Sequence, residues 1–126
     1  MDRFYYNKTL IALRLKQIKS GSIPQTDPKE PLQVVTLKHP KGTYLKAHLH
    51  QPKKRITQKL QECLIVVKGR IKIDLYTPQK KLIKYLYLNQ GEVLIIVNGG
   101  CGIHLLHESE IVEVKNGPFI EDKVLI

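Results

Sequence analysis

Residues 62–76, ECLIVVKGRIKIDLY, decide the fold class of this chain. Their first part, Cys63 to Val67, is a continuous apolar run, as expected of a strand that is buried on both faces. Gly69 interrupts the run, and residues 70–75 then alternate between charged and apolar side chains. Such alternation is typical of a half-exposed antiparallel strand. Two strands of these kinds, joined at a glycine, indicate a β-sheet protein.

The β pattern continues on both sides of this stretch. Short segments rich in β-branched and aromatic residues are separated by glycine, proline and asparagine, which favour turns. Many short strands with turns between them predict an all-β sandwich or barrel, the jelly-roll group included. We expect strands within residues 32–39, 43–50, 62–69, 70–77, 81–88, 92–97, 102–109 and 110–115.

The N-terminal part of the chain has a different pattern. Residues 9–20, TLIALRLKQIKS, predict a helix with an apolar stripe and with lysines in its last turn, where the helix dipole favours positive charge. The alternation in residues 13–16 also fits a strand, so this alternative stays open. Residues 21–31 contain three prolines and are expected to form a loop. We therefore expect residues 1–31 to form an N-terminal helix or arm and a loop, and residues 32–126 to form the barrel.

Length, composition and charge fit one globular domain with an anionic ligand. The chain has 126 residues, of which 42% are hydrophobic, and no tryptophan, so its core must consist mainly of Leu, Ile and Val. Its formal net charge is +10, which indicates either a basic surface or an anionic partner. The basic residues are scattered and are not interleaved with aromatic residues as in RNA-binding proteins. We expect an anionic small molecule as ligand, and neither nucleic acid nor a membrane as partner.

The cysteines and the first residues favour a cytoplasmic protein. Cys63 and Cys101 are the only two cysteines, too few for a disulfide framework. The first eight residues, MDRFYYNK, lack the apolar core of a signal peptide, and no apolar run reaches the roughly 18 residues that span a bilayer. We expect a cytoplasmic location with both thiols reduced.

Two histidines and a glutamate form the best candidate metal site. His48 and His50 are two residues apart on an expected strand, so their imidazoles point to the same face. Glu62 begins the apolar run, and a carboxylate at the start of a core strand requires a metal, an arginine or solvent. Two histidines and one carboxylate suit Fe(II), Mn(II), Zn(II) or Ni(II). The alternative is that Glu62 faces water at the edge of a strand.

This spacing resembles the first motif of the cupin family, in which Gly, five residues and His-x-His precede Glu, six residues and Gly. Here five residues lie between Gly42 and His48, and six lie between Glu62 and Gly69. The gap between the two halves, residues 51–61, is longer than in the family. The resemblance implies a double-stranded β-helix, a jelly-roll barrel with a divalent metal ion inside, and a homodimer.

The second cupin motif is present in a changed form. It resembles Gly, five residues, Pro-x-Gly, two residues and His, but Val97 stands in place of the proline. The strict histidine position falls on Gly102, and a turn one residue shorter places Cys101 there. The run from Gly99 to Ile103 is similar to that of a group of small bacterial cupins that carry Gly-Gly-His-Gly at this point.

The resemblance leaves three possibilities for a fourth metal ligand. Cys101 could bind as thiolate, His104 could reach in through a bulge, or the position could be vacant. We expect Cys101 to line the pocket, because Ile103 then shares its face and His104 points away unless the strand bulges. Tyr44, Ile103 and His104 complete the expected pocket lining.

Three functions are compatible with these residues. The first is a metal-dependent enzyme, similar to sugar isomerases, epimerases or dioxygenases, that acts on a small polar, anionic molecule of a carbohydrate pathway. The second is a non-catalytic cupin module that binds a small molecule with an empty or degraded metal site. The third is a nucleic-acid or membrane-surface protein that uses the net charge. The sequence ranks them in this order and leaves open whether the protein is an enzyme.

Overall fold

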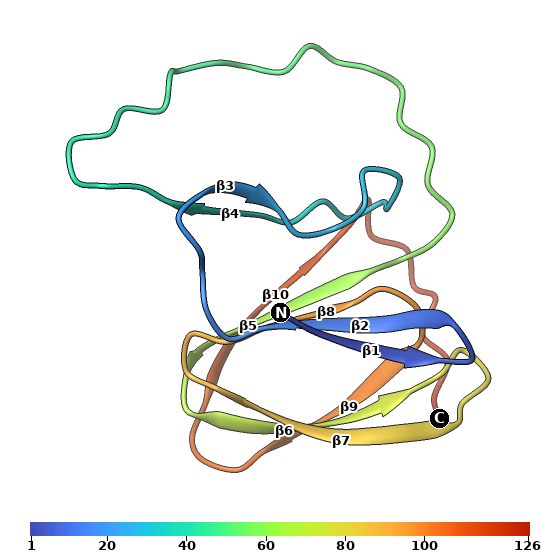
Figure 1. The fold of residues 1–126 in the computed structure, drawn as a ribbon. Helices are drawn as coiled ribbons and strands as arrows, with labels where there is room; N and C mark the ends of the chain where they lie inside the picture. The colour runs from blue at the N-terminus through green and yellow to red at the C-terminus, as the bar shows by residue number, and fades with distance from the viewer.

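The computed structural model of this chain describes all residues 1–126. They form ten β-strands and no helix (Figure 1). The expected all-β class is therefore confirmed. No part of the structure is an apolar helix long enough to cross a membrane. The strands are β1 (Asp2–Tyr6), β2 (Thr9–Leu15), β3 (Gly21–Pro24), β4 (Val35–Lys38), β5 (Glu62–Lys68), β6 (Arg70–Tyr76), β7 (Leu82–Asn89), β8 (Val93–Ile96), β9 (Gly100–Leu105) and β10 (Glu110–Lys115).

Two facing sheets form the body of the molecule (Figure 1). The larger sheet has the strand order β1-β2-β8-β5-β10, and the smaller one has the order β7-β6-β9. A separate β3-β4 hairpin lies beside them. From β5 onward the chain passes repeatedly between the sheets, because β5, β8 and β10 belong to the larger sheet and β6, β7 and β9 to the smaller. All neighbouring strands are antiparallel.

The helix predicted for residues 9–20 is wrong, and the strand alternative is right for its first part. β2 lies between β1 and β8, with Ala12 packed in one apolar cluster and Leu13 in another. Apolar cover on both faces suits a central strand, which explains a run without strict alternation. Asn7 and Lys8, with φ of 48° and 65°, form the two-residue turn that joins β1 to β2. Positive φ at both turn residues matches the twist of a tight hairpin.

The strand predicted within residues 43–50 is also wrong for this structure. Residues 39–61 form one long loop between β4 and β5, without a strand or helix. Figure 1 shows this loop as a wide arc away from the two sheets. A strand needs a neighbour to receive its backbone hydrogen bonds, and residues 43–50 have none in this chain.

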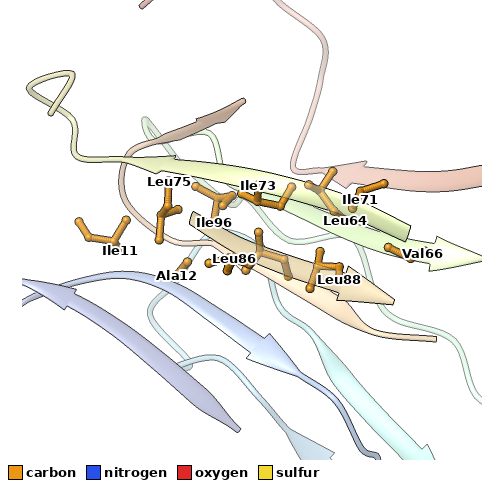
Figure 2. Close-up of a cluster of buried hydrophobic side chains, with 11 residues drawn as sticks. Ile11, Ala12, Leu64, Val66, Ile71, Ile73, Leu75, Leu86, Leu88 and Ile96 are labelled. Carbon is orange, nitrogen blue, oxygen red and sulfur yellow. The ribbon is translucent and has the colours of Figure 1, made fainter. Parts of the chain in front are cut away.

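The main core lies between the two sheets (Figure 2). Both sheets contribute apolar side chains that are almost completely buried, and Phe4, Tyr6, Ile83, Cys101 and Ile111 pack against them. Burial of this much apolar surface is the main driving force that holds the sheets together. The buried members are Ile11, Ala12, Leu64, Val66, Ile71, Ile73, Leu75, Leu86, Leu88, Leu94 and Ile96.

A second, smaller core covers the opposite face of the larger sheet. Its buried members are Leu13, Leu32, Cys63, Ile95 and Val97. Since successive residues of a strand point to opposite faces, the neighbours Cys63 and Leu64 lie in different cores. The apolar run of β5 is therefore buried on both sides, as the sequence predicts.

Gln61 links Glu30 and Leu32, in the segment before β4, to the larger sheet. Its side chain is 1% exposed. The side-chain amide donates to the carbonyl oxygen of Val97 and to the carboxylate of Glu30, and its oxygen accepts from the backbone N–H of Leu32. Its own backbone N–H donates to Asn116 Oδ1 at 2.8 Å. All polar groups of a buried side chain are thus paired, as burial requires.

Replacing Gln61 with alanine is expected to lower the free energy of unfolding by about 2–3 kcal/mol, because the N–H of Leu32 loses its buried acceptor and a cavity remains. Gln58→Ala is the matched control, since the Gln58 side chain is exposed and should change stability by less than about 0.5 kcal/mol. Chemical denaturation of both variants measures the difference. Equal stability of the two would show that the buried hydrogen bonds contribute nothing net.

Candidate functional site

His48 and His50 lie together on the long loop, away from the other predicted ligands. Their ring centroids are 5.1 Å apart, in an edge-to-face arrangement. Both residues are exposed, and His48 Nδ1 lies 3.0 Å from the carbonyl oxygen of Lys46. The structure thus confirms that the two imidazoles are neighbours, but it places no third ligand beside them.

Glu62 lies at the start of β5 on the face toward the smaller sheet. It shares this face with Leu64 and Val66, which are core residues. Its carboxylate is half-buried, and Glu62 Oε1 lies 3.6 Å from Lys115 Nζ. Partial burial, together with the negative charge of Glu113, raises the pKa of the Glu62 carboxyl group, and Lys115 opposes this shift.

Glu113 and Lys115 complete this group from the neighbouring strand. In the antiparallel register of β10 and β5, Lys115 is opposite Glu62 and Glu113 is opposite Leu64. Lys115 Nζ lies 2.8 Å from Glu113 Oε1. Its hydrogen bond and charge interaction with Glu113 raise the pKa of the lysine. We call Glu62, Glu113 and Lys115 the carboxylate–lysine cluster.

Neither Glu113 nor Lys115 was predicted from the sequence as a site residue. A signal was present, because in residues 110–115 the two charged residues share parity with Ile111, which packs against the main core. Inward-pointing charge on an edge strand also protects the strand from pairing with another chain, so this pattern alone does not predict a site. What the sequence could not supply was the register that places Lys115 opposite Glu62.

Cys101 lies on β9 and packs against the main core from the other sheet. It is opposite Leu75 in the register with β6. Burial first, and then the negative charges of Glu62, Glu113 and Asp74, raise the pKa of the Cys101 thiol to about 12. The thiol is therefore protonated at neutral pH, and the carboxylates of Glu62 and Glu113 are near enough for their charges to act on it.

Of the other predicted pocket residues, one shares the face of Cys101 and two do not lie there. Ile103 has the parity of Cys101 and is 38% exposed. His104 points to the opposite face, where its Nε2 lies 2.6 Å from Asp74 Oδ2, and this hydrogen bond lowers the pKa of the Asp74 carboxyl group. Tyr44 lies on the long loop, and its hydroxyl accepts a hydrogen bond from the N–H of Ala47. His104 and Tyr44 thus lie away from Cys101, and for His104 this is the outward orientation that strand alternation predicts in the absence of a bulge.

A cavity of about 290 Å³ adjoins the cluster at Lys115. The end of the long loop forms one wall, and the segment after β10 forms the other. Because Lys115 lines the cavity and also contacts both carboxylates, a molecule in the cavity would be next to the cluster. The lining residues are Thr57, Gln58, Lys59, Leu60, Lys115, Asn116, Gly117, Pro118, Phe119, Ile120 and Asp122.

The arrangement of donors does not fit a metal ion. No three His, Cys, Asp or Glu side chains are grouped to hold one. Glu62 has Lys115 as its partner. His48 and His50 lie apart from both. The metal site predicted from the motif spacing is not assembled in this structure.

Comparison with known protein families, with characterised proteins and with solved structures finds no match to this chain.

Proposed function

We propose that this chain is a cupin-type β-barrel module that binds a small polar, anionic molecule, carrying a sugar or a phosphate, in the cavity beside the carboxylate–lysine cluster. The single observation that carries the proposal is the position of Lys115. Its side chain lines the cavity, and its amine is within 3.6 Å of Glu62 Oε1 and 2.8 Å of Glu113 Oε1. A ligand there would contact the amine of Lys115, which in turn is paired with the two carboxylates.

The strand order supports the cupin-type part of the proposal. The six consecutive strands β5 to β10 are shared between two facing antiparallel sheets, and the chain crosses from one sheet to the other four times, as is typical of a jelly roll. Among these strands, β6 pairs with β7. The two strands that flank this pair in the sequence, β5 and β8, pair with each other. Such nested pairing arises when a long hairpin is wrapped into a barrel. In cupin-type folds a small ligand is held between the sheets, whereas the cavity here is lined by residues 57–60 and by Lys115 and the segment after it.

The chemistry of the cavity supports a polar ligand. Its walls carry the cations of Lys59 and Lys115, the carboxylate of Asp122, the amide of Gln58 and the aromatic ring of Phe119, which is 84% exposed. Lys59 is paired with Glu30, and Lys115 with Glu62 and Glu113. Amides and charged groups bind hydroxyl or phosphate oxygens, and an exposed ring can cover the apolar face of a sugar. The volume is at the lower end of ligand sites, which suits a molecule of the size of a monosaccharide. The net charge of +10 attracts anions to the surface.

An isomerase- or epimerase-like activity is a second candidate, favoured by the inner position of Glu62. A carboxylate beside a lysine can take a proton from a substrate carbon and return it, provided that the substrate is within hydrogen-bond reach. This reaction needs no group beyond the residues described. The metal-dependent form of the activity predicts metal in the purified protein, which elemental analysis measures directly.

Replacing Lys115 with methionine is expected to weaken ligand binding at least about tenfold, because the cation shared by cavity and cluster is lost. Calorimetric titration with glucose, glucose 1-phosphate, UDP-glucose and inorganic phosphate measures the affinities. Lys19→Met is the matched control, since Lys19 is exposed, lies outside the cavity and should leave binding unchanged. No binding of any of these compounds, or equal binding by both variants, would contradict the proposal.

An assay of turnover distinguishes a binding module from an enzyme. Proton NMR of the bound compound in D2O detects isomerisation or exchange of a carbon-bound proton. If exchange occurs and is lost in Glu62→Gln while binding remains, the second candidate is supported. If the compound binds and nothing is exchanged, the protein is a binding module.

A further inference from the structure

The outer face of the smaller sheet carries two exposed tyrosines among charged side chains. The strands β6 and β7 alternate, and their apolar side chains point into the main core. Tyr85 and Tyr87 of β7 therefore lie on the opposite face, where they are 53% and 43% exposed. Arg70, Lys72 and Asp74 of β6 point to this same face. Figure 1 shows the smaller sheet facing the larger one, so this face is turned away from the rest of the body.

A cation lies over each of the two tyrosine rings. The guanidinium carbon of Arg70 is 4.7 Å from the centroid of the Tyr87 ring, and Lys72 Nζ is 4.1 Å from the centroid of the Tyr85 ring. Both contacts are diagonal, because in the register of β6 and β7 the residue opposite Tyr87 is Lys72 and the residue opposite Tyr85 is Asp74. The attraction between a cation and a π-face favours this arrangement. The face thus repeats one unit, an aromatic ring beside a positive charge.

The β6-β7 hairpin also concentrates the charge of the chain. Residues 68–89 contain six lysines and arginines but only one acidic residue, so they hold a formal net charge of +5 out of +10. Lys81 and Lys84 contact aromatic rings of β1 and therefore add charge beside the face and not on it. The expectation that nucleic acid is not a partner rested on basic residues that are scattered in the sequence. The hairpin brings several of them together with aromatic rings.

The one carboxylate on this face is paired with two basic groups. Asp74 Oδ2 lies 2.6 Å from His104 Nε2 of β9, and Asp74 Oδ1 lies 3.5 Å from Lys72 Nζ. The side chain of Asp74 is 14% exposed, whereas that of His104 is 52% exposed. Because the carboxylate is covered and its charge is opposed at short range, it repels an approaching anion only weakly. Asp74 therefore holds Lys72 and His104 in place on a surface that stays positive.

We propose that this outer face binds single-stranded nucleic acid, with bases stacked on Tyr85 and Tyr87 and phosphates near Arg70 and Lys72. Residues two apart on a strand are separated by about 7 Å, so the two rings can take two consecutive unstacked bases. Exposed aromatic rings on a positively charged sheet are a common means of binding single strands. A duplex would not fit, because its bases are already stacked on one another. The face belongs to the other sheet from Lys115, so this site is separate from the cavity.

Fluorescence anisotropy with a labelled oligothymidylate of about eight nucleotides tests the proposal on the full chain. Tyr85→Ala and Tyr87→Ala are each expected to weaken binding at least about fivefold, because each removes one stacking ring. Tyr87→Phe keeps the ring and should bind like the wild type. Tyr5→Ala is the matched control, since Tyr5 is 57% exposed but lies on β1 in the larger sheet, and its loss should leave binding unchanged.

The salt dependence of binding measures the phosphate contacts separately. Arg70→Gln should make the slope of log K against log salt concentration shallower by about 0.7, the value for one phosphate contact of a single strand. Tyr85→Ala should weaken binding and leave this slope unchanged, because the tyrosine carries no charge. Lys19→Gln is the matched control for charge, since Lys19 is exposed and lies outside the hairpin. A slope that Arg70→Gln leaves unchanged would contradict the assignment of this face.

Tyrosine fluorescence provides a readout that needs no variant, should one of them fail to fold. The chain has no tryptophan, so the emission of its tyrosines is observed directly. Stacked bases should quench this emission, whereas an oligonucleotide of the same length without bases should quench nothing and bind at least about tenfold more weakly. Equal binding of the two would overturn the proposal, because the face would then attract any polyanion. No binding of either, or alanine variants that bind like the wild type, would overturn it as well.

Discussion

Replacing Gly99 with alanine is expected to lower the free energy of unfolding by about 4 kcal/mol or more, through two separate backbone costs. Gly99 has a φ of +116°, a conformation that residues with a side chain rarely adopt. An added Cβ would in addition overlap the carbonyl oxygen of Tyr76. That oxygen belongs to backbone at the end of β6 and cannot turn aside as a flexible side chain would.

Gly91→Ala is the control that separates the cost of the positive φ from the cost of the steric overlap. Gly91 also has a positive φ, of +83°, but nothing lies within 4 Å of a Cβ added there. This control should lose only about 1 kcal/mol, the cost of the backbone conformation alone. Urea denaturation of both variants measures the difference. If Gly99→Ala were as stable as Gly91→Ala, the close approach of the turn before β9 to the end of β6 would be contradicted.

The Cys101 thiol is expected to react with iodoacetamide at pH 8 roughly a thousandfold more slowly in the native protein than in the unfolded chain. Only the thiolate reacts, and burial together with nearby carboxylates raises the pKa from 9.0 to about 12. Cys63, whose pKa burial raises to about 11, should also be slow. Mass spectrometry of peptides alkylated with and without urea measures each site separately.

The same pKa shift has a consequence for stability at high pH. The unfolded thiol loses its proton near pH 9.0, whereas the folded thiol keeps it until about pH 12. Because the unfolded state then binds fewer protons, the free energy of unfolding falls as the pH rises through this range. Cys101→Ser should show a smaller fall, since the hydroxyl does not titrate there. Reaction of native Cys101 at the rate of the unfolded chain would contradict its buried position.

Much of the β-structure could be predicted from local pattern. The apolar run after Glu62, the turn at Gly69 and the alternation after it appear as β5 and β6, and the later segments appear as β7 to β10. These predictions succeed because alternation and turn residues are local properties of the chain. The prediction of a helix at residues 9–20 was wrong because β2 is buried on both faces. Its apolar run resembles the apolar stripe of a helix.

The candidate site was predictable only in part. Spacing alone predicts that His48 and His50 are neighbours, since residues two apart in an extended chain share a side. It also singled out Glu62 and Cys101, which are near enough for the charge of the carboxylate to act on the thiol. It could not predict that Lys115 would be the partner of Glu62, because the two are 53 positions apart and meet only through the register of β5 and β10.

The sequence by itself thus determined the all-β class, the positions of the strands from β5 onward and the pairing of the two histidines. These follow from interactions between residues close together in the chain. Only the tertiary structure decided that β2 is a strand, that residues 43–50 stand without a partner and that Glu62, Glu113 and Lys115 form one cluster. Each of these depends on which distant strand lies alongside, and that choice is made by the packing of two sheets around a shared core.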